Sequence, residues 1–162
     1  MTGLKDNLLK IAKTLGIKPD EFNAVGIYEW PEIMKKIEES FIIKKNSNIK
    51  FNRWWENLKE PQYGINVDSH PFHCINQLID GNEKIWFVAC DSNNDPSKFW
   101  LFQGYIKPIL KLLDEHYRFE FYLVSKKYEW LLCLNHHDNL IGLGSIIPKL
   151  QQMGKITRPN HV

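Results

Sequence analysis

The chain has 162 residues, of which 43% are hydrophobic and 25% are charged, and this balance excludes an intrinsically disordered protein. Its formal net charge of +2 is too small to predict a nucleic-acid or membrane-surface partner, because concentrated basic faces bind such partners. No apolar run approaches the roughly 20 residues that a membrane span needs, and we expect no signal peptide at the N-terminus.

The first half of the chain is predicted to be mainly helical. Leu4, Leu8 and Leu15 share one face of a helix, and Trp30-Pro31 begins a clearer one. The helices that we expect here cover residues 4–15, a short segment from 18, 30–41, 51–58 and 72–79. For residues 72–79 the competing interpretation is a strand that leads into a hairpin at Asp80-Gly81. Residues 59–69 are predicted to form a surface connection.

The second half is predicted to be richer in strands. Residues 85–90 form a continuous apolar run, which is typical of a central strand buried on both faces. The further predicted strands are 99–102, ended by Gly104, then 119–124, 130–134 and one that begins at 140–141. Two helices are expected over 106–113 and 146–153, the second with Ser145 as its N-cap.

These elements predict an α+β fold, in which N-terminal helices pack on a mainly antiparallel sheet with one inserted helix and a C-terminal helix. Residues 1–154 are expected to form a single domain, and 155–162 a flexible tail. Three cysteines without a CxxC pair, Cys74, Cys90 and Cys133, are typical of reduced, buried thiols in a cytoplasmic protein.

The most conspicuous polar segment is the turn that contains Asn135, His136, His137 and Asp138, between two apolar strands. Imidazoles and a carboxylate can bind zinc or another divalent metal, and His70 and His73 could add ligands if the two segments met. The alternative is that Asn and Asp supply only the turn geometry. We favour the second interpretation, because no zinc-binding spacing such as HExxH is present.

Other short motifs are less complete. The calcium-loop pattern that begins at Asp91 has Pro96 where a Gly is needed. Trp54 and Trp55, next to Arg53, could stack on nucleic-acid bases, but we favour a helical stripe packed on the core.

The sheet half also resembles a family of short bacterial proteins of unknown function. The segments that carry the resemblance are 85–89, 98–104 and 121–133, and its most specific part is Trp130-Leu131-Leu132-Cys133 followed by Asn135-His136-His137-Asp138. The general type is similar to bacterial immunity proteins, which are small, cytosolic and without a catalytic set. The resemblance therefore implies a compact binding protein and supplies no active-site residues.

Two functions follow from the sequence as hypotheses. The first is a non-enzymatic cytoplasmic binding protein without a cofactor, immunity-like, whose partner is another protein and which binds through the turn at Asn135–Asp138. The alternative is a metal-dependent hydrolase, or another metal-binding protein, that uses His136, His137 and Asp138 with His70 or His73.

Overall fold

The computed structural model describes residues 3–43, 56–67, 71–90, 99–116, 119–135 and 137–157. Within these ranges lie five helices and one seven-stranded sheet. The helices are α1 (Leu4–Thr14), α2 (Trp30–Phe41), α3 (Pro71–Leu78), α4 (Ile106–Glu115) and α5 (Ile147–Thr157). The strands are β1 (Phe22–Ala24), β2 (Gln62–Asn66), β3 (Lys84–Cys90), β4 (Phe99–Tyr105), β5 (Phe121–Ser125), β6 (Trp130–Leu134) and β7 (Asn139–Gly144).

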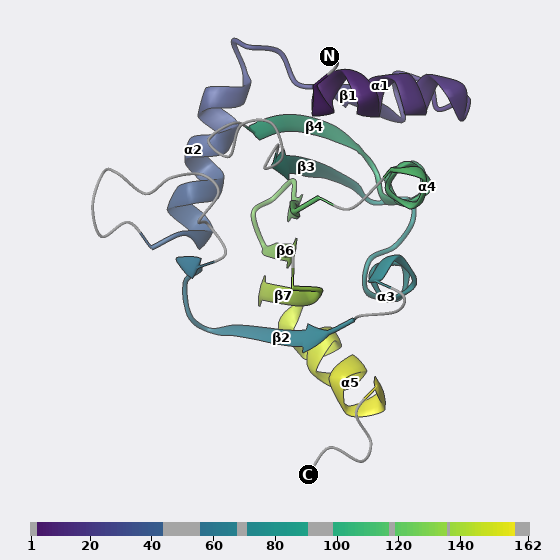
Figure 1. Cartoon of the computed structure of the whole chain (residues 1–162). Coiled ribbons are helices and arrows are strands. Elements are labelled where there is room, and N and C mark those ends of the chain that lie inside the picture. The colour runs from purple at the N-terminus through teal and green to yellow at the C-terminus, as the bar shows by residue number, and fades with distance from the viewer. Residues whose placement is uncertain are drawn as a thin grey trace.

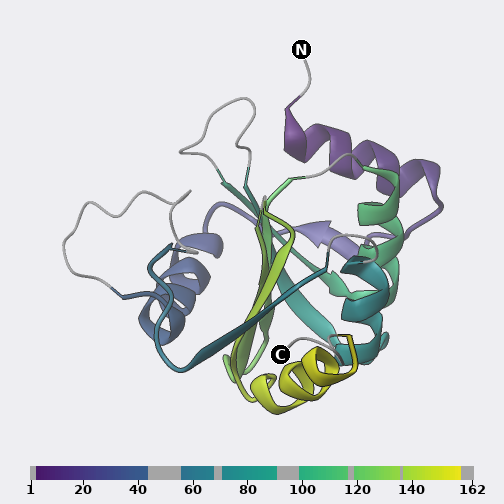
Figure 2. The same cartoon turned by 60° about the horizontal axis from the view of Figure 1, so that its bottom comes forward.

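The sheet is antiparallel throughout, in the order β1-β4-β3-β5-β6-β7-β2. Helix α2 crosses one side of it, which we call the α2 face, and the other four helices cover the opposite side (Figures 1 and 2). The α+β class predicted from the sequence is confirmed. The expectation that helices come first in the chain is not met, because β1 and β2 lie among the early helices.

The central strands are buried on both faces. In β5 and β6 every residue is buried, and alternate side chains enter two separate cores. Leu123 and Leu132 face the four helices, whereas Val124 and Leu131 face α2. This arrangement explains why these strands are continuous apolar runs, as the sequence of residues 85–90 and 130–134 predicted.

Four phenylalanines join neighbouring strands on the side of the four helices. Phe22 of β1 stacks on Phe102 of β4 with ring centroids 4.9 Å apart. Phe87 of β3 lies 5.8 Å from Phe102 and 5.7 Å from Phe121 of β5. Each such pair contributes about 0.5–1.5 kcal/mol beyond the burial of its surface. The cluster therefore fixes the β1 edge strand, which is only three residues long, to the centre of the sheet.

Both edges of the sheet differ from the sequence prediction. The short helix expected from Lys18 is wrong, since Glu21 and Phe22 close turns onto Lys18 and the chain enters β1. The surface connection expected over 59–69 contains β2, which pairs with β7 along its whole length. Pairing with a distant strand satisfies these backbone groups, and local propensity gives no sign of it.

Three boundaries also move. Strand β4 continues through Gly104 to Tyr105, and β7 runs through Gly144. Helix α5 begins at Ile147, so the predicted N-cap at Ser145 is wrong. The helix predicted for residues 72–79 is confirmed as α3, which removes the alternative of a strand.

Several predictions fall partly outside the described residues. These include the tryptophan pair at 54–55 and the polar loop that begins at Asp91. Helix α5 extends to Thr157, so residues 155–157 of the expected tail are helical, and 158–162 lie outside the description. No helix of the described part of the chain is long and apolar enough to cross a membrane.

Gly144 tests how β7 ends. Its φ of +76° matches that of Gly16, at +75°, but a Cβ at Gly144 would clash with the Glu129 carbonyl oxygen, whereas a Cβ at Gly16 would meet no atom within 4 Å. We predict that Gly16→Ala lowers the free energy of unfolding by about 1 kcal/mol, through backbone strain alone. Gly144→Ala should cost more than about 3 kcal/mol, because strain and a backbone clash add. Urea denaturation measures both, and equal losses would contradict the clash.

Candidate functional site

The turn between β6 and β7 is organised by Asn135. Its Oδ1 accepts hydrogen bonds from the backbone N–H groups of His137 (2.9 Å) and Asn139 (3.2 Å). Asp138 takes a left-handed conformation, with φ +60°, which aspartate tolerates better than most residues. Asn135 is buried and Asp138 is half-buried, whereas His137 is exposed. Two of the four predicted residues thus have a structural task, and His136 lies outside the described residues.

The end of β2, which precedes the second histidine segment in the chain, lies beside this turn. The Val67 N–H donates to the Asp138 carbonyl oxygen (2.9 Å), and Asn66 Nδ2 donates to the His137 carbonyl oxygen (3.4 Å). Pairing of β2 with β7 therefore brings residue 67 next to the predicted turn. His73 lies further on, exposed on α3, where its Nε2 is 3.1 Å from Gln77 Nε2.

A metal centre requires more than this proximity. Among the described residues, no group of three His, Cys, Asp or Glu side chains could hold a metal ion. His70 and His136, the remaining predicted ligands, lie outside those residues. The metal hypothesis therefore stays a prediction.

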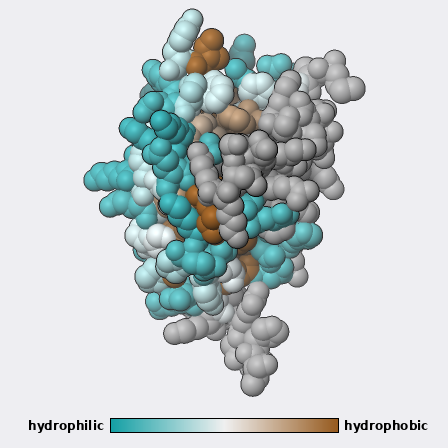
Figure 3. All heavy atoms as spheres, turned by 90° about the vertical axis from the view of Figure 1, so that its left-hand side faces the viewer, coloured by the Kyte–Doolittle hydropathy of each residue, from teal (hydrophilic) through white to brown (hydrophobic). Residues whose placement is uncertain are grey.

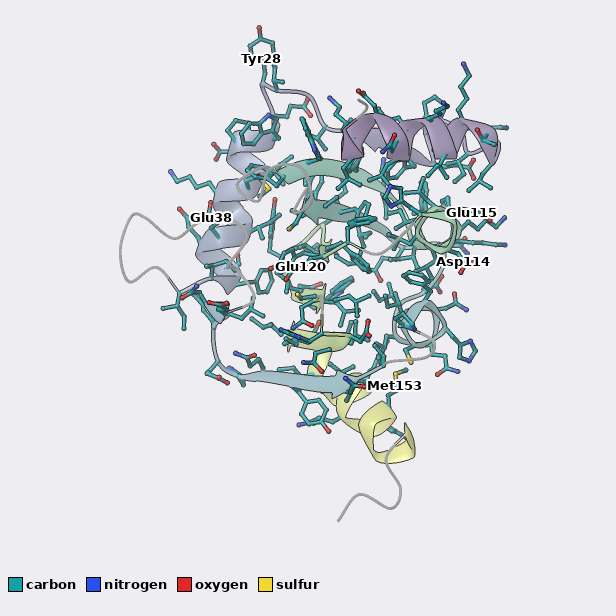
Figure 4. The ribbon with its side chains drawn as sticks, viewed as in Figure 1. Tyr28, Glu38, Asp114, Glu115, Glu120 and Met153 are labelled. Atoms are coloured by element: carbon teal, nitrogen blue, oxygen red, sulfur yellow. The ribbon has the colours of Figure 1, made fainter. Side chains whose placement is uncertain are left out.

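A row of buried polar residues crosses the sheet at the same end of the strands as the turn. Glu120 sits opposite Cys90 of β3, whose N–H donates to the Glu120 carbonyl oxygen (3.0 Å), and the register of β5 with β6 places Asn135 on its other side. Tyr122 and Cys133 form the next row on the α2 face. Figure 4 shows Glu120 between α2 and the sheet. A carboxyl group and an amide are thus enclosed in a largely apolar layer.

Burial controls the acid–base properties of this row. Glu120 is only 6% exposed, and burial raises the pKa of its carboxyl to about 7, with a smaller contribution from the Glu56 carboxylate. Burial also raises the pKa of the Cys90 thiol, and Glu120 adds to the effect. The Cys133 pKa is raised by burial, Glu120 and Cys90, against an opposing hydrogen bond from Tyr122. These two thiols are therefore protonated at neutral pH and are poor nucleophiles.

A second polar group lies at the opposite end of these strands. Lys126, in the turn after β5, places its Nζ 3.3 Å from the centroid of the Trp86 ring and donates to Gln103 Oε1 (2.6 Å). Lys84 Nζ lies 5.9 Å from the centroid of the Tyr105 ring. We call these five residues of β3, β4 and the β5–β6 turn the lysine shelf.

The third feature is a projecting apolar tip formed by Ile27 and Tyr28, in the connection from β1 to α2. Ile27 is 69% exposed and Tyr28 is 94% exposed, the highest values among the described large hydrophobic residues. Figure 4 shows Tyr28 pointing away from the body of the molecule. Figure 3, which is viewed from the α2 side, shows exposed apolar atoms at the top of the molecule. Tyr28 projects from the same end of the molecule in Figure 4.

Sequence reasoning missed Glu120, the lysine shelf and the tip. Glu120 could have been noticed as a single acidic residue between Phe119 and Phe121. The alternation of side chains along the strand directs it toward a core. The shelf has no sequence signal, because its residues come from separate strands. The tip could have been noticed as two large apolar residues that follow Gly26 in a predicted connection.

Over the described residues, these features define an α+β protein with a seven-stranded antiparallel sheet, helices on both faces, a buried polar row and a fixed apolar tip. The chain belongs to DUF6756, a family of unknown function, whose model matches residues 1–154. The predicted resemblance to a family of unknown function is confirmed at this level. No curated protein and no solved structure matches the chain.

The raised pKa of Glu120 predicts how stability depends on pH. The folded state holds this proton more tightly than the unfolded state, whose carboxyl has its ordinary pKa of 4.5. The free energy of unfolding should therefore fall as the pH rises from about 4.5 to about 7, by roughly 3 kcal/mol in all. Glu120→Gln stays neutral, so relative to wild type it should gain about that amount between pH 4.5 and pH 8. Urea denaturation at both pH values measures the difference.

Glu115→Gln is the matched control, since Glu115 is exposed at the outer end of α4 (Figure 4). It should leave the pH dependence of the wild type unchanged. A Glu120→Gln variant that loses stability equally at both pH values would show that the carboxyl is ionised and specifically paired in the folded protein.

Proposed function

We propose that the protein acts by binding another protein, without catalysis and without a cofactor, and that the Ile27–Tyr28 tip is the centre of the contact. The observation that carries the proposal is the exposure of these two adjacent large side chains on a connection between β1 and α2. Binding and recognition residues concentrate on such connections. Tyrosine is enriched among the residues that dominate binding energy, because its ring buries a large area with few rotatable bonds.

The tip is held in place by the rest of the fold. The Val25 N–H donates to the Leu101 carbonyl oxygen (2.9 Å), which attaches the segment to β4. The N–H groups of Glu29 and Trp30 both donate to the Gly26 carbonyl oxygen (3.0 Å each) and close the turn. The Trp30 ring then packs edge-on against Phe99, with centroids 5.2 Å apart. A partner therefore meets a surface whose conformational entropy is already reduced, which favours affinity.

Burial of the tip supplies a useful free energy. Full burial of one large apolar side chain is worth about 1.5–3 kcal/mol, so the two together offer at most roughly 3–6 kcal/mol before the costs of association. In the free protein, the side chains of Ile27 and Tyr28 have no packing role, since neither belongs to either hydrophobic core. The buried, protonated thiols of Cys90 and Cys133 support a role in binding over nucleophilic catalysis.

The more specific form of the proposal is a bacterial, cytoplasmic, immunity-like protein whose partner is a toxin. It rests on the resemblance of Trp130–Cys133 and Asn135–Asp138 to proteins of that general type. In that form, the partner is inhibited when the complex forms, and the tip is the part of this chain that enters the contact.

A photo-reactive amino acid at position 28 tests the contact directly. In cells that produce the protein, it should cross-link to one partner, whereas the same amino acid at Glu115, on the far side of the molecule, should not. With that partner purified, Ile27→Ser/Tyr28→Ser should weaken binding at least about tenfold, because each side chain acts as an interface anchor. Isothermal titration calorimetry measures the change in affinity. The free energy of unfolding of the double variant should stay within about 0.5 kcal/mol of the wild-type value. Undiminished binding by the double variant would contradict the proposal.

The second candidate is a metal-binding protein, favoured by the hydrogen bonds that bring the end of β2 to the turn at His137 and Asp138. Metal analysis of protein purified without a histidine tag separates the two functions. We expect substoichiometric zinc, manganese and iron that do not change in His136→Ala/His137→Ala. One full equivalent of metal in the wild type, lost in that variant, would establish the metal site instead.

A further inference from the structure

The lysine shelf places two ammonium groups on the same end of the α2 face. Lys84 lies opposite Tyr105 in the β3–β4 register, and Trp86 lies opposite Gln103. Both lysines lie over aromatic rings, Lys126 over Trp86 and Lys84 over Tyr105. An aromatic face attracts a cation but satisfies few of its N–H donors, so these groups keep donors for another acceptor.

Lys126 is held by a chain of hydrogen bonds that reaches the backbone. Its Nζ donates to Gln103 Oε1 (2.6 Å), and Gln103 Nε2 donates to Asn23 Oδ1 (3.1 Å). Asn23 Nδ2 then donates to the Pro19 carbonyl oxygen (2.8 Å). Strands β1 and β4 therefore fix the position of this side chain. A ligand that meets it does not have to order a mobile lysine, which distinguishes it from an ordinary surface lysine.

The two lysines of the shelf lie close enough to repel each other. Burial and the nearby charge of Lys84 lower the pKa of Lys126 to about 8, and Glu29 acts in the opposite direction. Among the described residues, no carboxylate forms an ion pair with Lys84 or Lys126. An additional carboxylate at the shelf would relieve the repulsion between the two lysines.

The shelf and the tip are connected through the start of α2. Glu29, whose charge acts on Lys126, directly follows Tyr28, and the Glu32 carboxylate, in the first turn of α2, acts on Tyr128 of the β5–β6 turn. One partner can therefore cover both features. Two lysines are fewer than the continuous basic face that a nucleic-acid backbone requires.

We infer that the lysine shelf binds Asp or Glu carboxylates of an acidic segment in the protein partner, beside the apolar contact at Ile27 and Tyr28. This inference rests on the proposed function, and it adds the chemistry of the partner: a surface that combines an apolar pocket with acidic side chains. Charge complementarity of this kind sets the rate and specificity of association more than the affinity.

A titration with a synthetic Glu-rich peptide tests the inference without the natural partner. In protein with ¹³C-labelled lysine, NMR should show saturable shifts at Lys84 and Lys126 but not at the exposed Lys111 and Lys149. Bound peptide should raise the pKa of Lys126 toward the ordinary lysine value, and the Gln-rich counterpart should have no effect. Lys84→Met and Lys126→Met should each weaken binding roughly fivefold, and Lys149→Met should not.

The outcomes separate the two proposals. Uniform shifts at all lysines, no saturation, or tighter binding of a single-stranded oligonucleotide than of the peptide would overturn the inference. If the peptide fails while position 28 still cross-links to a protein, the proposed function stands and its partner is not acidic at the shelf. If the peptide binds and no cross-link forms, the shelf recognises acids and the proposed function fails. Thermal unfolding of each lysine variant checks that it is folded.

Discussion

The burial of the central strands on both faces is the constraint on which the rest of this structure depends. Strands β3, β5 and β6 lie between α2 and the four other helices, and their side chains fill two cores. A polar group on these strands loses its hydration unless the protein replaces it. Two buried polar residues show the consequence: the carboxyl of Glu120 has a raised pKa, and Asn135 Oδ1 accepts backbone hydrogen bonds that organise the turn.

Under the proposed function, the same constraint places the contacts with a partner at the ends of the strands and in the connections. The turn after β5 presents Lys126, and the connection from β1 to α2 presents Ile27 and Tyr28. Both features are attached to the rigid sheet, Lys126 through Gln103 and the tip through Val25. A rigid sheet that holds two exposed features in a fixed relation is suited to binding a preformed surface, and the proposed function depends on this property.

The sequence predicts the parts of the fold that local patterns determine. Helices α1, α2 and α4 have clear apolar stripes, and the apolar runs of β3, β5 and β6 identify the centre of the sheet. The edge strands β1 and β2 could not be predicted, because β1 is three residues long and β2 follows Pro61 and contains Gly64. Their strand character comes from pairing with β4 and β7, which are distant in the chain. The candidate site is less predictable from the sequence than the fold is. Asn135 could be identified through its turn chemistry. The exposure of Tyr28 and the approach of Lys126 to Trp86 depend on the assembled fold.

Hydrogen–deuterium exchange on the complex with the partner that cross-links at position 28 tests the central claim most directly, since it compares every candidate surface at once. Binding should slow exchange at residues 26–30, 103–105 and 126–128, which contain the tip and part of the lysine shelf. Exchange in α3 and in the turn at 137–139 should stay the same as in the free protein. Slower exchange in that turn and in α3, with no change at 26–30, would contradict the account and would return the binding site to the histidine segments.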